Sequence, residues 1–120
     1  MTATTALFLV EDDPLIRDLL EASLTEAGFE VIEVGNGTKA LAEFDAGAAR
    51  FRAVITDIRL GAGPDGWAVA RRARELVPNM PVVYMSGDSS HEWSSKGVPN
   101  SLMGPSPSLR PRSSLRSRPS

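Results

Sequence analysis

The chain has 120 residues, which is the size of one domain. It contains no cysteine, which excludes disulfides and thiolate metal sites, and no apolar stretch long enough to cross a bilayer. The N-terminus lacks the basic, apolar and small-residue order of a secretion signal, so we expect a cytoplasmic protein without membrane contact.

Charge is distributed unevenly along the chain. Residues 1–103 contain fifteen acidic residues and nine Lys or Arg, whereas residues 104–120 contain four Arg and no acid. An acidic body argues against nucleic-acid binding by this domain. We expect the basic tail to be solvated and disordered.

The first half of the chain alternates between two apolar patterns. Residues 6–10 (ALFLV) form a continuous apolar run, which is typical of a strand covered on both faces. Pro14 and the spacing of the leucines after it predict a helix that closes at Gly28. Residues 30–34 (EVIEV) alternate as in a more exposed strand, and residues 38–46 carry apolar side chains at helical spacing.

The second half continues this alternation. Residues 53–56 (AVIT) predict a third strand, and residues 67–77 predict a helix after the glycine-rich loop 60–66. Three more elements are predicted: a fourth strand at 82–85 (VVYM), a short helix at 89–96 and a weak fifth strand at 99–103.

This order of strands and helices predicts an α/β fold with a parallel sheet and helices on both faces. In such folds, ligands bind beyond the carboxyl ends of the strands. Polar residues that directly follow the apolar strands are therefore the candidate functional residues.

Reactive side chains follow three of the predicted strands. Glu11, Asp12 and Asp13 follow the first strand, Asp57 ends the third, and Ser86 follows the fourth. Carboxylates that converge at one sheet edge repel one another unless a cation joins them, and oxygen ligands without His or Cys suit Mg²⁺. An aspartate can also accept a phosphoryl group as a covalent aspartyl-phosphate, while a serine hydroxyl donates to one of its oxygens. The pattern favours a magnesium-assisted phosphoryl site.

Two long segments, LFLVEDDPLIRDLLEASLTEAGFEVIEVGNG and AVITDIRLGAGPDGWAVARRARELVPNMPVVYMSGD, resemble the receiver domain of two-component response regulators in content and spacing. The resemblance implies a flavodoxin-like, doubly wound, five-stranded parallel sheet of order 2-1-3-4-5. It also implies a receiver domain over residues 1–103, followed by an aberrant Ser/Pro/Arg-rich tail over 104–120. Because that tail has four prolines and no helical apolar stripe, we expect the last helix of the family to be absent or disordered.

The resemblance assigns roles to the acidic residues. Asp57 corresponds to the phospho-acceptor and also contacts the Mg²⁺. Asp13 corresponds to a direct Mg²⁺ ligand, and Asp12 to the second acidic position, which acts through water. The backbone carbonyl of Arg59 corresponds to the third protein ligand.

The resemblance also assigns the phosphate-binding groups, one of which is missing. Ser86 corresponds to the switch hydroxyl, and Gly87 beside it leaves room for the phosphate. The family's Lys-Pro pair falls on Ser106 and Pro107, so the lysine that contacts the phosphoryl group is absent. We expect phosphoryl acceptance to persist and switching to be impaired.

The composition of the tail suggests a shifted reading frame. With suitable codons from Gly104 onward, the frame one base earlier would encode Thr-Lys-Pro-Phe-Ala-Pro, which suits the fifth strand and the start of the last helix in a receiver. A naturally divergent tail is the alternative, and the encoding DNA distinguishes the two. Losing the helix would expose apolar surface, so we expect either a less stable domain or a homodimer that covers it.

The resemblance implies a signalling protein that is not an enzyme beyond its own phosphorylation and dephosphorylation. A histidine kinase or phosphotransfer protein would supply the phosphoryl group, and a downstream protein target would read it by contact. One alternative is a degenerate receiver that works as a phosphorylation-independent interaction module. An aspartate-dependent phosphohydrolase is disfavoured, because the second acid it needs two residues after the nucleophile is replaced by Arg59.

Overall fold

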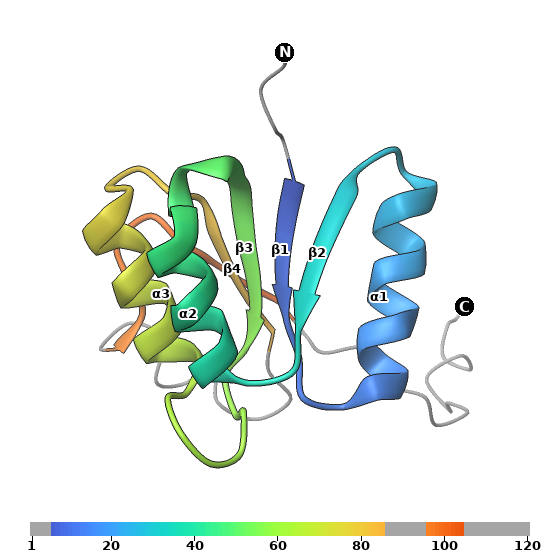
Figure 1. Cartoon of the computed structure of the whole chain (residues 1–120), viewed down its shortest axis with the longest axis horizontal. Helices are drawn as coiled ribbons and strands as arrows, with labels where there is room; N and C mark the ends of the chain where they lie inside the picture. The colour runs from blue at the N-terminus through green and yellow to red at the C-terminus, as the bar shows by residue number, and fades with distance from the viewer. Residues whose placement is uncertain (1–5, 86–95, 105–120) are drawn as a thin grey trace, which may run out of the picture.

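The computed structural model describes residues 6–85 and 96–104 (Figure 1). Strands and helices alternate along these residues as far as the fourth strand, with one short 3₁₀ turn at Ala48–Arg50. The elements are β1 (Ala6–Val10), α1 (Pro14–Glu26), β2 (Glu30–Val34), α2 (Gly37–Gly47), β3 (Phe51–Asp57), α3 (Gly66–Leu76), β4 (Val82–Met85) and β5 (Leu102–Gly104).

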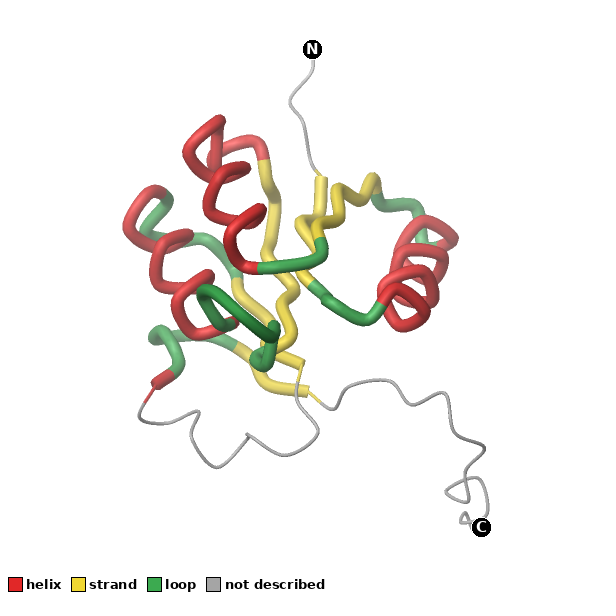
Figure 2. The backbone as a smooth tube through the Cα atoms, turned by 60° about the horizontal axis from the view of Figure 1, so that its bottom comes forward, coloured by secondary structure: helices red, strands yellow, loops and turns green. Residues whose placement is uncertain are grey.

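The strands form one parallel sheet in the order β2-β1-β3-β4-β5, which confirms the predicted fold. Helices α2 and α3 lie on one side of this sheet and α1 lies on the other (Figures 1 and 2). In the register, Val10 of β1 is level with Thr56 of β3, and Asp57 is level with Met85 of β4. The residues that follow β1, β3 and β4 therefore meet at one edge of the sheet.

Each helix begins at a polar side chain that accepts hydrogen bonds from the first turn. Asp13 caps α1, Asn36 caps α2 by accepting from the Lys39 N–H at 2.8 Å, and Asp65 caps α3. These caps satisfy backbone donors that have no partner inside the helix, and they fix where each helix leaves its loop.

The main core lies between the sheet and the α2/α3 layer. Phe8 stacks on Phe51 with ring centroids 4.3 Å apart and meets Phe44 edge-on at 5.1 Å. Trp67 of α3 packs against Tyr84 of β4 at 4.7 Å. Because these aromatic rings are all buried, they hold β1, β3 and β4 in the positions that determine the site.

Two strands differ from their predicted bounds. β3 begins at Phe51 rather than residue 53, since Phe51 is buried against Phe8 and so belongs to the sheet. β5 begins at Leu102 rather than residue 99. Residues 99–101 form a turn in which Asn100 has a φ of 59° and the Ser101 hydroxyl donates to the Val98 carbonyl at 2.7 Å.

Several predicted features lie outside the described residues. They are most of the helix over 89–96, the phosphate-binding residues Ser86 and Gly87, and the tail with Ser106 and the position of the last helix. Within the described ranges, none of the helices is both long and apolar enough to span a membrane.

Candidate functional site

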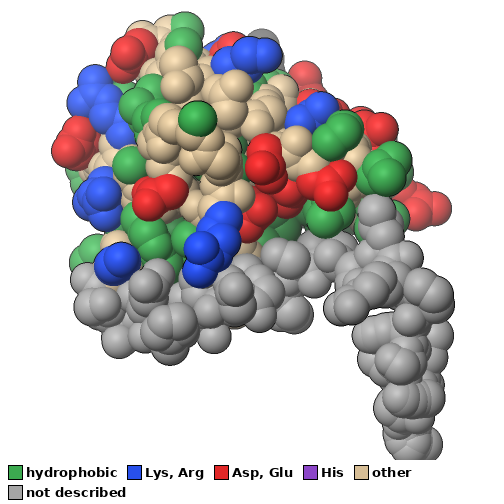
Figure 3. All heavy atoms as spheres, turned by 90° about the horizontal axis from the view of Figure 1, so that it is seen from below, with side chains coloured by type: hydrophobic (Ala, Val, Ile, Leu, Met, Phe, Trp, Pro, Cys, Tyr) green, Lys and Arg blue, Asp and Glu red, His purple; other side chains and the backbone are tan. Residues whose placement is uncertain are grey.

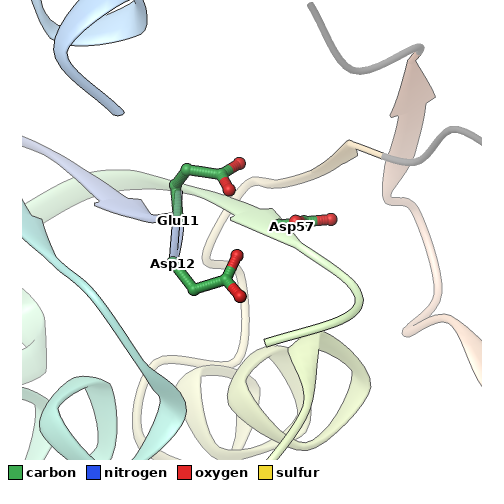
Figure 4. Close-up of side chains that lie close together, drawn as sticks. All are labelled: Glu11, Asp12 and Asp57. Carbon is green, nitrogen blue, oxygen red and sulfur yellow. The ribbon is translucent and has the colours of Figure 1, made fainter. Parts of the chain in front are cut away.

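Three carboxylates meet beyond the ends of the two central strands. Glu11 and Asp12 follow β1, Asp57 ends β3, and one oxygen from each lies within 4.8 Å of the others (Figure 4). Viewed toward the lower end of the sheet in Figure 1, acidic side chains gather at this edge (Figure 3). The site is where the sequence places the candidate residues, but its membership differs by one residue.

Glu11 is a buried acid that the sequence places at the strand end but to which the family resemblance gave no role. Its side chain is 2% exposed, and Oε2 accepts the Asp13 N–H at 3.0 Å. Arg17 secures the backbone here: Nη1 donates to the Glu11 carbonyl at 2.9 Å, and Nε donates to Glu33 Oε1 at 3.1 Å. Glu11 is therefore held in place through both its side chain and its backbone.

Burial raises the pKa of Glu11 from 4.5 to about 8. The Asp13 N–H favours the ionised form and opposes this shift, while the charges of Asp57 and Asp12 add to it. In the absence of a cation, Glu11 is therefore mostly protonated at neutral pH.

Burial also raises the pKa of Asp57, and the charge of Asp12 adds to the shift. The backbone N–H groups of Ile58 and Arg59 oppose it, as does the neighbouring Glu11 carboxyl, which acts as a donor when it keeps its proton. Asp57 is thus a partly desolvated carboxylate with donors around its charge, a suitable environment for a nucleophile.

Asp13, the residue expected to bind Mg²⁺ directly, has a different role in the structure. Its Oδ1 accepts the N–H groups of Leu15 at 2.9 Å and Ile16 at 3.4 Å, and it is not part of the three-carboxylate cluster. A signal for this was present in the sequence, because Pro14 suits the first helical position and the residue before it is then the N-cap. Counting back from that cap leaves Glu11 and Asp12 as the acids at the strand end.

The loop after β3 is pinned closely against the site. The Gly66 N–H donates to the Ile58 carbonyl at 2.8 Å, and a Cβ at Gly66 would lie 2.3 Å from the Asp57 carbonyl oxygen. Gly61, at a φ of 76°, lies opposite Asp12, since a Cβ there would be 3.9 Å from Asp12 Oδ2. Glycine at these positions allows the loop to close over the carboxylates.

A cleft of about 460 Å³ opens beside the cluster. Its lining includes Ile58, Arg59, Leu60 and Gly61 from the loop, Trp67 from α3, and Lys96. The loop that carries the site therefore also forms one wall of a space large enough to admit part of a donor group.

The three carboxylates suit Mg²⁺. They present oxygen donors from two adjacent strands, one from each carboxylate within 4.8 Å of the others, and Mg²⁺ prefers oxygen ligands of this kind. The predicted participation of the Arg59 carbonyl, of Ser86 and of Gly87 stays a prediction.

Comparisons with known proteins agree with this geometry. The model of the response regulator receiver domain family matches residues 7–101. The C4-dicarboxylate transport transcriptional regulatory protein DctD of Rhizobium meliloti is 37% identical over 87 residues, which are 72% of this chain and 18% of that protein. The transcriptional regulatory protein AruR of Pseudomonas aeruginosa is 39% identical over 77 residues, 62% of this chain and 31% of its own length. The chain thus spans a third or less of these curated relatives.

Solved structures show the same fold. A response regulator receiver protein from Sinorhizobium medicae is 45% identical with a TM-score of 0.82, covering 88% of this chain and 84% of that one. The response regulator TrrA from Thermotoga maritima, solved in complex with Mg²⁺ and BeF, is 28% identical with a TM-score of 0.74, covering 89% and 90%. With the family model matching most of its length and the sheet order expected of that fold, the chain belongs to the response regulator receiver domain family.

Proposed function

We propose that this receiver domain accepts a phosphoryl group on Asp57 from a histidine kinase or a phosphotransfer protein. The observation that carries the proposal is the convergence of Glu11, Asp12 and Asp57 at the end of the two central strands. The lining of the nearby cleft includes Ile58 and Arg59, the two residues that follow Asp57.

Glu11, Asp12, Asp57 and the backbone carbonyl of Arg59 would hold Mg²⁺ in this site. When bound, the ion would offset negative charge on the transferring phosphoryl oxygens. Asp13 is left out of this set because it caps α1.

In the transfer step, a carboxylate oxygen of Asp57 attacks the phosphorus atom of the donor. The new O–P bond forms as the P–N bond to the donor imidazole breaks, and the imidazole leaves with the bonding electron pair. The N–H groups of Ile58 and Arg59 hold the nucleophile from behind. Ser86 and Gly87 are the proposed phosphate-binding residues.

Incubation with Mg²⁺ and acetyl phosphate, followed by intact-mass measurement, tests this proposal. We expect one phosphoryl adduct on the wild-type chain, none on Asp57→Asn and an undiminished yield on Asp13→Ala. An equal yield on Asp57→Asn would rule out Asp57 as the acceptor. EDTA should reduce the wild-type yield at least tenfold.

The serine at position 106 favours a second candidate function. Since no lysine is present there to contact the phosphoryl group, the domain could bind its protein target equally well in both states, as a phosphorylation-independent interaction module. A pull-down of the target, with and without treatment by a phosphoryl donor, separates the two candidate functions. A phosphorylation-dependent receiver should bind differently after treatment, and Asp57→Asn should abolish this difference. An interaction module should bind equally in all samples.

We further propose that the receiver unit ends with β5 at Gly104, one residue beyond the predicted boundary, and that residues 105–120 form a separate tail. The domain catalyses no reaction beyond its own phosphorylation and dephosphorylation. We also propose a cytoplasmic location, where a histidine kinase or phosphotransfer protein would supply the phosphoryl group. The predicted homodimer is the alternative way to cover the exposed apolar surface, and sedimentation tests it.

A further inference from the structure

The two faces of the sheet are covered unequally. Helices α2 and α3 pack on one face and enclose the aromatic core, whereas α1 is the helix on the other face among the described residues (Figure 2). α1 lies over the β2/β1 side of that face, so the part formed by β3, β4 and β5 extends beyond it.

A row of apolar side chains crosses this second face. Leu9, Ile55, Val83 and Leu102 are level with one another on four adjacent strands. Leu9 beside α1 is fully buried, Ile55 and Val83 are partly buried, and Leu102 is 64% exposed. Leu15 and Leu19 on α1 are 65% and 41% exposed. Apolar exposure on this side is therefore repeated on several elements rather than scattered.

The border of this face is strongly acidic. Within α1 and β2 the acidic residues are Asp18, Glu21, Glu26, Glu30 and Glu33, and the one base, Arg17, pairs with Glu33. Asp18, Glu26 and Glu30 are exposed. A second copy of the chain docked here would bring two acidic borders together, which disfavours self-association through this face.

The chain itself contains a segment of opposite charge next to this face. Residues 105–120 follow Gly104 at the end of β5 and carry four Arg, no acid and the two leucines Leu109 and Leu115. Its four prolines favour the extended polyproline conformation, which has three residues per turn. In that conformation Leu109 and Leu115 share one side with Arg112 and Arg118, and Arg110 and Arg116 share another.

The distances suit this segment. The five residues from Gly104 to Leu109 span about 15 Å at about 3.1 Å per residue. Three strand spacings, from β5 to β1, amount to about 14 Å. Leu109 can therefore reach any position along the apolar row, and Leu115 can reach α1.

We propose that residues 105–120 dock in extended form on the uncovered face of the sheet beside α1. Leu109 and Leu115 cover the apolar row, and Arg110 and Arg116 on another side of the segment pair with the acidic border formed by α1 and β2. The prolines prevent the segment from forming a helix over this apolar face, so the segment covers the face in extended form.

Paramagnetic relaxation in the full chain tests this docking. Because the chain has no cysteine, Ser113→Cys provides a single site for a nitroxide label. A ¹⁵N-labelled, spin-labelled chain diluted into excess unlabelled wild type should lose more than half of the amide signal intensity at Leu19, Val83 and Leu102. Amides of Ala40 and Ala73 on the opposite layer should keep theirs.

Variants confined to the segment provide the control. Two double variants should each restore the amide intensities at least twofold: Leu109→Ser with Leu115→Ser, and Arg110→Gln with Arg116→Gln. Addition of 0.5 M NaCl should restore the intensities when the leucines and arginines of the segment are unchanged. Ser114→Gln, which leaves the leucines and arginines intact, should not. Unchanged intensities in the labelled chain would overturn the proposal. A second experiment mixes a nitroxide-labelled chain that carries no ¹⁵N with a ¹⁵N-labelled wild-type chain. Signal losses that appear only in this mixture would also overturn the proposal, because they would mean that the segment docks on a second copy of the chain.

Discussion

Glu11 and Asp57 are acidic neighbours whose different surroundings give them different roles. Glu11 is almost completely buried and keeps a proton to high pH, while Asp57 is partly buried and has two backbone N–H groups directed at its charge. The pair can therefore hold a single shared proton when no cation is present. Cation binding then requires Glu11 to lose that proton, which links metal affinity to pH.

The raised pKa of Glu11 predicts a falling stability with rising pH in EDTA. Because the folded-state pKa of about 8 lies above the ordinary 4.5, the folded protein binds more protons than the unfolded chain between these values. The free energy of unfolding should therefore fall from about pH 4.5 to about pH 8, by at most about 1.4 kcal/mol per pH unit, and then level off. Urea unfolding at several pH values measures it.

Glu11→Gln is the matched control for this pH dependence. The neutral amide fills the same buried position, so the decline should largely disappear in EDTA. Mg²⁺ should reverse the decline in the wild type and have little effect on the variant. A wild-type slope that matches the variant would show that Glu11 ionises normally in the folded protein.

The predictable part of the site was the part determined by the strand ends. Glu11 and Asp12 follow one apolar run and Asp57 ends another, and the carboxyl ends of these runs must meet in a parallel sheet. Which of the three consecutive acids bind the metal depends on which one caps α1. Helix geometry determines that, and residue type does not. Sequence patterns also contain no measure of the burial that gives Glu11 its pKa.

Helix caps, and loops held by backbone hydrogen bonds, position the residues of the site. Asp13 starts α1 one residue after Asp12, and Gly66 starts α3 with its N–H bonded to Ile58, next to Asp57. A helix start thus lies immediately beside each strand end that contributes a carboxylate. Local changes at these starts should separate stability from site function.

Asp13→Ala should lower stability with little loss of magnesium binding. Removing the side chain leaves the Leu15 and Ile16 N–H groups without their acceptor, which costs about 1 kcal/mol. The Mg²⁺ midpoint, followed by tryptophan fluorescence or NMR, should change less than threefold. Asp12→Asn should weaken Mg²⁺ binding at least tenfold with a smaller effect on stability. The reverse ranking would restore Asp13 as the ligand.

Gly66→Ala should slow phosphorylation of Asp57. A Cβ here would lie 2.3 Å from the Asp57 carbonyl oxygen and 2.7 Å from the Ile58 Cα, so the backbone at the nucleophile must shift. We expect the rate with acetyl phosphate to fall at least tenfold.

Gly28→Ala provides the comparison for this loop. Gly28 has a φ of 101° and no atom within 4 Å of an added Cβ, so alanine introduces about 1–3 kcal/mol of backbone strain far from Asp57. Its phosphorylation rate should stay within twofold of the wild type while the protein remains folded. Equal rate losses in both variants would mean that the Gly66 effect is only a loss of stability.

At the scale of the whole molecule, helices cover the two faces of the sheet unequally. The sequence predicts the strand order by family resemblance and the buried strands by their apolar runs. It does not predict how much of each face is covered, since coverage depends on where the helices lie. The apolar residues Ile55, Val83 and Leu102 look like core positions in the sequence, yet their exposure increases toward the β5 edge.

This asymmetry predicts that truncations on the two layers will have very different costs. Phe44 of α2 is 1% exposed and touches both Phe8 and Phe51, so Phe44→Ala should lower the free energy of unfolding by about 3–5 kcal/mol. Leu19 of α1 is 41% exposed, and Leu19→Ala should cost about 1 kcal/mol or less, since much of its side chain meets solvent already. Urea unfolding followed by circular dichroism measures both.

The larger loss is a substantial part of the roughly 5–15 kcal/mol that stabilises a typical domain, so Phe44→Ala should be partly unfolded at physiological temperature unless Mg²⁺ is added. Magnesium binds only the folded protein and should recover stability in proportion to the logarithm of its concentration. Comparable costs for Phe44→Ala and Leu19→Ala would contradict this account, because they would require α1 to cover as much apolar surface as α2 does.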